Sequence, residues 1–380
     1  MAKSEVKWIR LGEFVLPSDK RNTEDKKMPV MGLNAKKTFM PTVANLTDVD
    51  LSKYKVVNQS EFAFSGMQTG RDECIRIAIS DCEKPFLISP AYSTFMVDKS
   101  KGVLPEYVFM YFFRAEMDRY GWFISDSSVR ANLDWPRLMD IQIPVPYTDG
   151  KPDLEKQKVV VDAWQGLRKM KEDNEQLVEP LMQLCRSYME SVKKKYNPTH
   201  IGPFIEEVDE RNTDGKFKED SVVGLATSKE IIKTKANLEG VNLTSYKVFR
   251  PNDIAYVADT SRRGDKVSLA MNKTDETYLV SSISTVFRTK KGLLSGFLYL
   301  WFRRPEFDRY ARFHSWGSAR EAFDYDKMEA VKIPIPSEQE QQAIIDIYKC
   351  AERAKHIAEE ADRLSREICP ALMQHIIHEN

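Results

Sequence analysis

The sequence predicts an α+β protein made of two tandem-duplicated mixed α/β domains, separated by two long antiparallel coiled-coil helices. Three observations lead to this fold class. One unusual phrase occurs twice, each copy of it is followed by an Ile-Pro-x-Pro motif, and a segment with heptad patterning comes after each motif. Together they predict a molecule with pseudo-two-fold symmetry.

The internal repeat is the strongest of these observations. "RAEMDRYGWFISDSSVR" begins at Arg114, and "RPEFDRYARFHSWGSAR" begins at Arg304, 190 residues later. Other pairs keep this spacing to within two residues, among them "RNTE" and "RNTD", "LSKYKV" and "LTSYKV", and "IPVP" and "IPIP". Such a small drift indicates a duplicated domain with short loop insertions, since repeats of this length are domains and not solenoid units.

Each copy begins with a mixed region. Short β-branched or aromatic runs such as "IRIAI" and "YSTFMV" alternate with Gly, Pro, Asn and Asp turns, which predicts strands. One helix with a buried aromatic face is expected in each copy, over "LPEYVFMYFFRAEMDRYG" and "LSGFLYLWFRRPEFDRYA". Asp118 and Asp308 lie in these helices, and we expect them to form a repeated salt bridge or cap.

A long helix is predicted after each Ile-Pro-x-Pro motif. Proline interrupts both sheet ladders and helices, so the motif marks a boundary. Apolar residues then recur at alternating spacings of three and four, as in a heptad seam. The first seam comprises Val160, Ala163, Leu167, Met170, Asn174, Leu177, Leu181, Leu184 and Tyr188, and the second comprises Ile344, Ile347, Ala351, Ala354, Ala358, Ala361, Ser365, Ile368 and Leu372.

These boundaries predict four segments. Residues 1–146 and 198–336 are the two globular domains, and residues 147–197 and 337–380 are the central and distal helices. Because the first helix leads from one domain to the other and the second returns, the two helices should be antiparallel.

Composition excludes several classes of protein. The 57 basic residues balance the 57 acidic ones, so net charge provides no argument for a nucleic-acid partner. Five scattered cysteines fit reduced thiols. The chain has no apolar N-terminal segment and no run of 18 apolar residues, which argues against secretion and membrane insertion. We therefore expect a cytoplasmic protein.

Catalytic motifs are missing from the sequence. It contains no GxxxxGK[ST], GxGxxG or HExxH, and "YNPTH" lacks the aromatic residue of an amino-methyltransferase motif. No nucleophile stands at a readable spacing from a base. His375 and His378 fit a solvated helix end better than a metal site. We expect no catalytic residue, no metal and no bound cofactor.

Polar loops, in contrast, are repeated. "SGMQTGRDECIRIAI" and "VADTSRRGDKVSLAM" each place a hydroxyl, an arginine and a glycine on a tight loop, which suits contact with DNA phosphates and base edges. The tail of the repeated phrase and the runs "ISPAYSTF" and "VSSISTVF" add further candidates. The candidate DNA-binding residues are Thr69, Arg71, Ser89, Tyr92, Ser128 and Arg130 in the first copy and Ser261, Arg262, Arg263, Lys266, Ser281, Ser318 and Arg320 in the second.

Each of these features also has a plainer interpretation. An arginine loop can be a solvated turn. The arginines of the phrase tails can pair with a carboxylate such as Asp134 or Asp324.

The junctions between domain and helix resemble those of a known family. "MEAVKIPIPSEQEQQAIIDIY" and "LMDIQIPVP…LEKQKVVVDAW", within the duplicated architecture, are similar to the DNA-specificity subunits of type I restriction–modification systems. The resemblance covers nearly the whole chain. The first junction departs from the usual short form by inserting "YTDGKPDLE".

The resemblance implies a role in DNA recognition without catalysis. Each domain would be a target-recognition domain that reads one half of a bipartite site in double-stranded DNA. The helices would set the spacer and dock two methyltransferase subunits, which bind S-adenosylmethionine, and restriction subunits could join the complex. The residues expected to dock partners are Gln157, Trp164, Leu167, Gln341, Ile344 and Ile347.

Two other classes stay open at this stage. A coiled-coil adaptor whose two globular heads bind proteins is compatible with the composition. A free-standing enzyme with a site assembled from both heads is the weaker alternative. Positive concavities on both heads would favour DNA, and apolar patches would favour protein partners.

Overall fold

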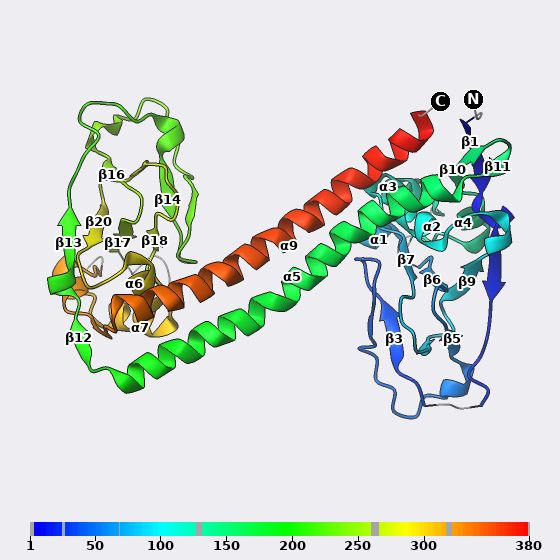
Figure 1. Cartoon of the computed structure of the whole chain (residues 1–380), viewed down its shortest axis with the longest axis horizontal. Helices are drawn as coiled ribbons and strands as arrows, with labels where there is room; N and C mark the ends of the chain where they lie inside the picture. Colours follow the sequence, from blue (N-terminus) through cyan, green and yellow to red (C-terminus); the bar gives the residue numbers. More distant parts are fainter. Residues whose placement is uncertain are drawn as a thin grey trace. The chain divides into compact units, whose positions relative to one another are not determined.

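The computed structural model describes residues 4–24, 27–67, 69–126, 131–259, 266–316 and 321–378 (Figure 1). It divides into two compact units. Unit 1 comprises Met1–Glu175 and His356–Asn380, and unit 2 comprises Gln176–Lys355. Each unit therefore contains one of the predicted globular domains together with part of both long helices, a division that differs from the four predicted segments.

Unit 1 is built on three sheets. The first is antiparallel, with the order β2 (Val15–Ser18), β9 (Ser93–Val97), β6 (Phe62–Ser65) and β7 (Arg76–Ile79). The second has the order β4 (Phe39–Pro41), β3 (Val30–Leu33), β8 (Phe86–Ile88) and β5 (Lys55–Val57), with β3 parallel to β8. The third joins β1 (Ser4–Arg10), β10 (Gln142–Thr148) and β11 (Lys151–Pro152).

Unit 2 repeats this topology, which confirms the predicted fold class. Its four-stranded sheet has the equivalent order β13 (Ile205–Val208), β20 (Ser284–Thr289), β17 (Ile254–Val257) and β18 (Leu269–Met271). The second sheet corresponds to the pairs β14 (Val223–Leu225) with β15 (Ile231–Lys233) and β16 (Lys247–Phe249) with β19 (Tyr278–Val280). β12 (Pro198–His200) pairs with β21 (Lys332–Pro334), as β1 pairs with β10.

The single helix predicted in each copy is wrong, because two helices stand in its place. They are α2 (Pro105–Phe112) and α3 (Ala115–Ile124) in unit 1, and α6 (Ser295–Phe302) and α7 (Pro305–Phe313) in unit 2. Arg114 and Arg304 separate them in extended conformations, with ψ angles of 144° and 143°. Pro305 explains the second break, since proline disfavours a helical conformation at the preceding residue. Three short helices, α1 (Thr69–Asp72), α4 (Trp135–Met139) and α8 (Tyr325–Glu329), complete the domains.

The two long helices are α5 (Leu154–Lys195) and α9 (Glu338–His378). α5 begins later than predicted because the β10–β11 hairpin occupies the start of that segment. Within unit 1 the helices are antiparallel. Lys171 pairs with Asp362 at 3.1 Å, whereas the earlier Trp164 shares a core with the later Cys369.

The first predicted seam has the right spacing, but at alternate positions the inward-facing residue is the one after the predicted residue. The side chains that are buried or half-buried along α5 are Lys156, Gln157, Val160, Val161, Trp164, Leu167, Arg168, Lys171, Asn174, Val178, Leu181, Met182, Cys185, Met189 and Val192. Met170, Leu177, Leu184 and Tyr188 are exposed. The second predicted seam is buried or half-buried at every position from Ile344 to Leu372, as expected.

The globular cores explain this register. Val160, Val161 and Trp164 of α5 and Cys369, Met373 and Ile376 of α9 all belong to the main core of unit 1. Cys185, Met189 and Val192 of α5 belong in the same way to the main core of unit 2. Each helix therefore turns toward a domain at both of its ends, and domain packing selects its buried face. Within the described ranges, no helix has the length and apolarity needed to span a bilayer.

Candidate nucleic-acid interface

In unit 1, two loops meet at one end of the four-stranded sheet. We call residues 66–75, between β6 and β7, loop A and residues 125–132, after α3, loop B. Ser65 pairs with Arg76 and Phe64 pairs with Ser93, so loop A and the turn before β9 extend from the same sheet end. The Leu133 N–H donates to the Gly66 carbonyl at 2.9 Å, which brings loop B against loop A.

This contact between the loops requires glycine at position 66. A Cβ atom there would lie 1.8 Å from the Leu133 carbonyl oxygen. Loop B is closed by two further hydrogen bonds, in which Asn132 N–H donates to the Asp126 carboxylate at 2.9 Å and Asp126 N–H donates to the Asn132 carbonyl at 3.0 Å.

The same arrangement recurs in unit 2. The Phe323 N–H donates to the Ala258 carbonyl at 2.9 Å, at the positions equivalent to Leu133 and Gly66. Trp316 and Ala322 exchange backbone hydrogen bonds of 3.2 and 3.0 Å and so close the second loop. We call residues 258–267 loop A and residues 315–322 loop B of this unit. In both units, we call the described residues of these two loops the loop face; residues 68, 127–130, 260–265 and 317–320 lie outside the description.

A buried Lys–Asp pair anchors loop A in each unit. In unit 1, Lys37 Nζ lies 2.6 Å from Asp118 Oδ1, which also accepts the Ile75 N–H at 2.8 Å. In unit 2, Lys229 pairs with Asp308, which accepts the Val267 N–H at 3.0 Å. The last residue of each loop A is thus held by a carboxylate that is half-buried in unit 1 and buried in unit 2. This confirms the expected repeated salt bridge.

Both lysines are satisfied inside the protein. Lys37 Nζ also donates to the Phe112 carbonyl at 2.6 Å, and Lys229 Nζ donates to the Val267 carbonyl at 2.7 Å. Burial lowers the pKa of each lysine, and the aspartate partner opposes that shift. Because both lysines are paired inside the protein, they hold the loop face in position and do not add to its surface charge.

The predicted DNA-contact residues that the structure describes differ in burial and in hydrogen bonding. Thr69 is buried, and its hydroxyl donates to the Gly66 carbonyl at 3.0 Å, a placement that argues against a DNA contact. The Ser89 hydroxyl accepts the Ala91 N–H within its own turn. Tyr92 is half-buried against the core of the second sheet. Ser281 is half-buried, and Lys266 is exposed.

The other candidate DNA-binding side chains are not among those described. Ser128, Arg130, Ser261, Arg262, Arg263, Ser318 and Arg320 lie outside the described residues, as does the side chain of Arg71. Their contacts with DNA stay predictions.

Four of the six residues predicted to dock partners are buried in their own domains. They are Gln157, Trp164, Gln341 and Ile344. The Gln157 side chain accepts the Leu104 N–H and donates to the Gly102 carbonyl, both at 2.9 Å. Gln341 makes the equivalent contacts with Leu294 and Gly292, both at 2.8 Å. These glutamines fasten each long helix to its domain, which corrects the docking role expected for them. Leu167 and Ile347 are half-buried.

Exposed aromatic side chains border loop B, and sequence reasoning missed them. They are Trp122 and Phe123 at the end of α3, and Phe313 and Trp316 at and just after the end of α7. The helix was expected to use its aromatic residues for the core, as Tyr107 and Tyr111 do. The signal that could have found them is the recurrence of phenylalanine in "RYGWF" and "RYARF".

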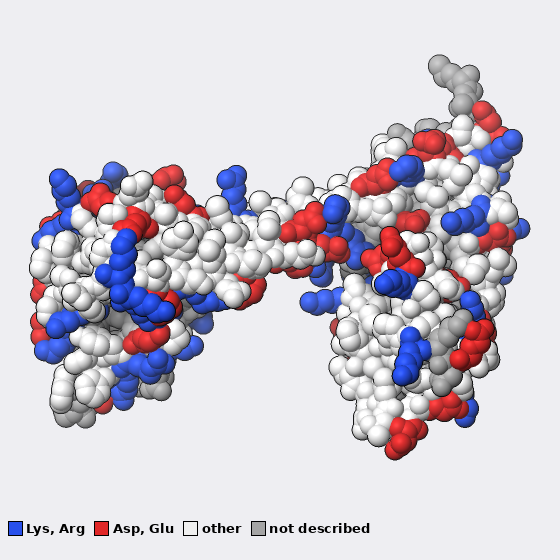
Figure 2. All heavy atoms as spheres, turned by 60° about the horizontal axis from the view of Figure 1, so that its bottom comes forward, with Lys and Arg blue, Asp and Glu red and all other residues white. Residues whose placement is uncertain are grey.

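The face drawn in Figure 2 shows no dominant charge among the described residues. In the view of Figure 2, basic and acidic side chains are interspersed over each unit. This agrees with the net charge of zero. In the part of the chain that the structure describes, no three His, Cys, Asp or Glu residues are grouped so that they could hold a metal ion.

Comparison with known proteins agrees with the fold. Residues 193–361 match the family described as the type I restriction modification DNA specificity domain. The S subunit of a type I restriction–modification system from M. genitalium has a similar structure, with a TM-score of 0.62 at 11% identity over 99% of this chain and 97% of that one. The HsdS subunit from Thermoanaerobacter tengcongensis matches with a TM-score of 0.39 at 13% identity, over 98% and 97% of the two chains. No curated protein matches the chain in sequence.

The second copy of the repeat thus matches a DNA specificity domain, and the fold of the whole chain is similar to that of a solved S subunit. The resemblance predicted from the sequence is confirmed. The matched residues 193–361 include the second globular domain and parts of both long helices.

Proposed function

We propose that the chain is the specificity subunit of a type I restriction–modification complex and that each unit reads one half of an asymmetric bipartite DNA target. The observation that supports this is the loop face, which recurs at the same sheet end in both units. The loops differ in sequence, with "GMQTGRDE" in one copy and "ADTSRRGD" in the other. Since bases are read by side chains at their edges, different loops should select different half-sites.

The division between scaffold and reader supports the same proposal. The Lys–Asp pairs and the glutamine contacts are duplicated, and they hold the loops and the long helices in place. The loop sequences are free to vary on this scaffold without loss of the fold. The long helices would then set the unread spacer between the half-sites.

The partners in this proposal are two methyltransferase subunits, with restriction subunits as further members of the complex. The methyltransferase subunits would bind S-adenosylmethionine and methylate adenine. Leu177, Leu184 and Tyr188 are exposed on α5 in unit 2, at spacings of seven and four that keep them on one face of the helix. Exposed apolar stripes are typical of protein interfaces, so we place docking there and not at the buried glutamines.

The test of DNA specificity is a map of N6-methyladenine in the source cell, made by single-molecule sequencing with the gene intact and deleted. We expect deletion to abolish methylation at one asymmetric, two-part motif. Arg71→Ala should then relax one half of that motif, and Arg263→Ala should relax the other. A deletion strain in which every methylated motif persists would contradict the proposal.

The docking surface is tested by pulling down the full chain and identifying the methyltransferase by mass spectrometry. Leu184→Glu should lose the methyltransferase without changing the thermal unfolding temperature of the chain. Val241→Glu, at another exposed apolar position of unit 2, is the matched control. Retention of the methyltransferase by Leu184→Glu would show that docking occurs elsewhere.

A further inference from the structure

Two exposed phenylalanines occupy equivalent positions in the two units. Phe123 lies near the end of α3 with 84% of its surface exposed, and Phe313 is the last residue of α7 with 78% exposed. They are 190 residues apart, the spacing of the duplication. A single exposed apolar side chain is ordinary. The recurrence of a large exposed ring at one point of a duplicated domain indicates a shared use.

Each phenylalanine is accompanied by an arginine. Arg119 and Arg309 precede Phe123 and Phe313 by four residues, so each pair shares one face of its helix. Both arginines are exposed. The nearest carboxylate oxygen recorded for Arg119 belongs to Glu116 at 3.5 Å, with both side chains solvated, which is a weak ion pair. Each helix thus presents a cation and an aromatic ring side by side.

These pairs border the loop face. α3 ends at Ile124, directly before loop B, and it packs closely on the end of loop A. A Cβ atom at Gly121 would lie 2.4 Å from the Ile75 side chain. In unit 2, Ala311 of α7 and Val267 at the end of loop A belong to the same core. The helix that carries each pair is therefore fixed to both loops.

We propose that the pairs Arg119–Phe123 and Arg309–Phe313 are DNA-contacting elements of the two units. In each pair the arginine binds a backbone phosphate, and the phenylalanine ring packs on the neighbouring sugar and base. This inference rests on the proposed function and adds a contact that lies outside the loops. An arginine next to an aromatic ring suits a polyanion with apolar base surfaces. A protein partner would favour a wider apolar patch.

The experiment uses the full chain co-purified with its methyltransferase subunits and a pool of random-sequence duplex DNA. Bound DNA is sequenced to obtain the motif that the wild-type chain selects, and affinities for that motif are then measured at several salt concentrations. The variants are Phe123→Ala, Phe313→Ala, Arg119→Gln and Arg309→Gln. Val43→Ala and Val241→Ala change exposed apolar residues on other segments of the same two units and serve as controls. Thermal unfolding verifies that each variant is folded.

We expect each phenylalanine variant to lose about tenfold in affinity, the scale of one lost aromatic contact with a base. This loss of affinity should depend on the DNA sequence of one half-site only, the one read by the unit that carries the substitution. Each arginine variant should weaken binding to all sequences and lower the slope of log affinity against log salt by about one. The control variants should bind as the wild type does.

The outcomes separate this inference from the function on which it rests. If the wild-type chain selects no motif, the proposed function fails, and the inference fails with it. If the wild type selects a motif and the phenylalanine variants bind it unchanged, only the inference is overturned. Variants that keep DNA binding but lose a co-purifying subunit would also overturn it, and would assign the rings to a protein interface.

Discussion

The two junctions between a domain and its long helix begin alike and then diverge. At the start of each long helix a glutamine side chain bonds to a loop of the domain. Gln157 bonds to the loop before α2 in unit 1, and Gln341 bonds to the loop before α6 in unit 2. About three turns further along, the two units use different chemistry at equivalent positions.

In unit 1, a single arginine side chain is surrounded by three aromatic rings. The Arg168 guanidinium lies 5.6, 5.3 and 4.9 Å from the ring centroids of Phe109, Phe113 and Trp164. Burial lowers the pKa of Arg168 from its usual value. Its charge is stabilised there mainly by ring faces, as in cation–π contacts elsewhere.

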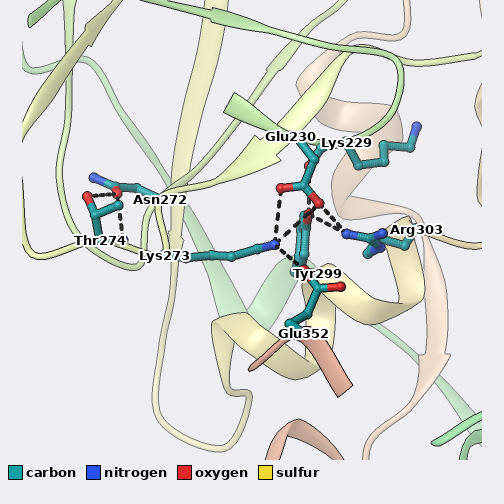
Figure 3. A network of polar contacts seen from close by, with 8 residues as sticks. All are labelled: Lys229, Glu230, Asn272, Lys273, Thr274, Tyr299, Arg303 and Glu352. Atoms are coloured by element: carbon teal, nitrogen blue, oxygen red, sulfur yellow. Dashed lines mark hydrogen bonds and ion pairs between the residues drawn. The ribbon is translucent and has the colours of Figure 1, made fainter. Parts of the chain in front are cut away.

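Unit 2 uses an ionic network at the same place (Figure 3). Glu230 contacts both Arg303 and Lys273, and Lys273 also lies 3.9 Å from Glu352, the counterpart of Arg168. The Tyr299 hydroxyl donates to the Lys229 carbonyl at 2.6 Å. Two basic and two acidic side chains thus replace the single cation, while the rings of Tyr299 and Tyr348 still face Lys273 and Arg303.

The difference shows which contacts a duplicated domain preserves. The glutamines bond to backbone groups, whose positions follow from the fold, so the same side chain serves both copies. The side-chain contacts around Arg168 and Glu352 need only be complementary to each other, and there each copy has its own solution. The Lys–Asp pairs, whose aspartates also bond to backbone N–H groups, are the same in both copies. The first implication is that scaffold contacts should contribute equally in the two units.

The largest effect is expected at the buried Lys–Asp pairs. Lys37→Met and Lys229→Met each leave a buried aspartate without its cation, which should cost about 3–5 kcal/mol in the free energy of unfolding of the affected unit. Chemical denaturation of the full chain would measure it, with the exposed Lys53→Met as control. If the two variants lost clearly different amounts of unfolding free energy, the two pairs would not be equivalent.

A smaller effect is expected where α3 packs on loop A. In unit 1 the larger Ile75 of loop A faces Gly121 of α3. In unit 2 the smaller Val267 of loop A is combined with the larger Ala311 of α7. Gly121→Ala should cost about 1–3 kcal/mol by overpacking. Adding Ile75→Val should recover much of that loss, because it recreates the combination of unit 2. A double-mutant cycle measures the coupling, and strictly additive effects would refute the size match.

The smallest effect concerns acid sensitivity at the start of α9. Hydrogen bonds from Lys195, then Tyr196 and Ser337, hold the pKa of Glu340 at about 2, below its usual 4.5. A carboxylate with a depressed pKa stabilises the fold above its unfolded pKa and loses this contribution as pH falls through the folded value. Glu340→Gln should therefore flatten the fall of the unfolding temperature between pH 4.5 and 2. Its counterpart in unit 1 is Lys156, so Lys156→Gln should leave that acid response in place.

The duplication and the two long helices could be predicted from the sequence, because they depend on the spacing of matching phrases and on helical periodicity. The Ile-Pro-x-Pro motif, expected to interrupt a sheet ladder, instead lies within β10 in unit 1 and runs through the end of β21 in unit 2, on strands whose partners are distant in sequence. The repeated Asp118 and Asp308 were also assigned correctly to salt bridges, although their lysine partners, far away in the sequence, were not foreseen.

Only the tertiary structure decided which side chains face inward. The register of the first seam differed by one residue at alternate positions because the domain cores take up Trp164, Cys185 and Met189. The same packing buries Gln157 and Thr69 and leaves Phe123 exposed. Burial depends on elements that are distant in sequence, and a periodic pattern read along one helix carries no information about them.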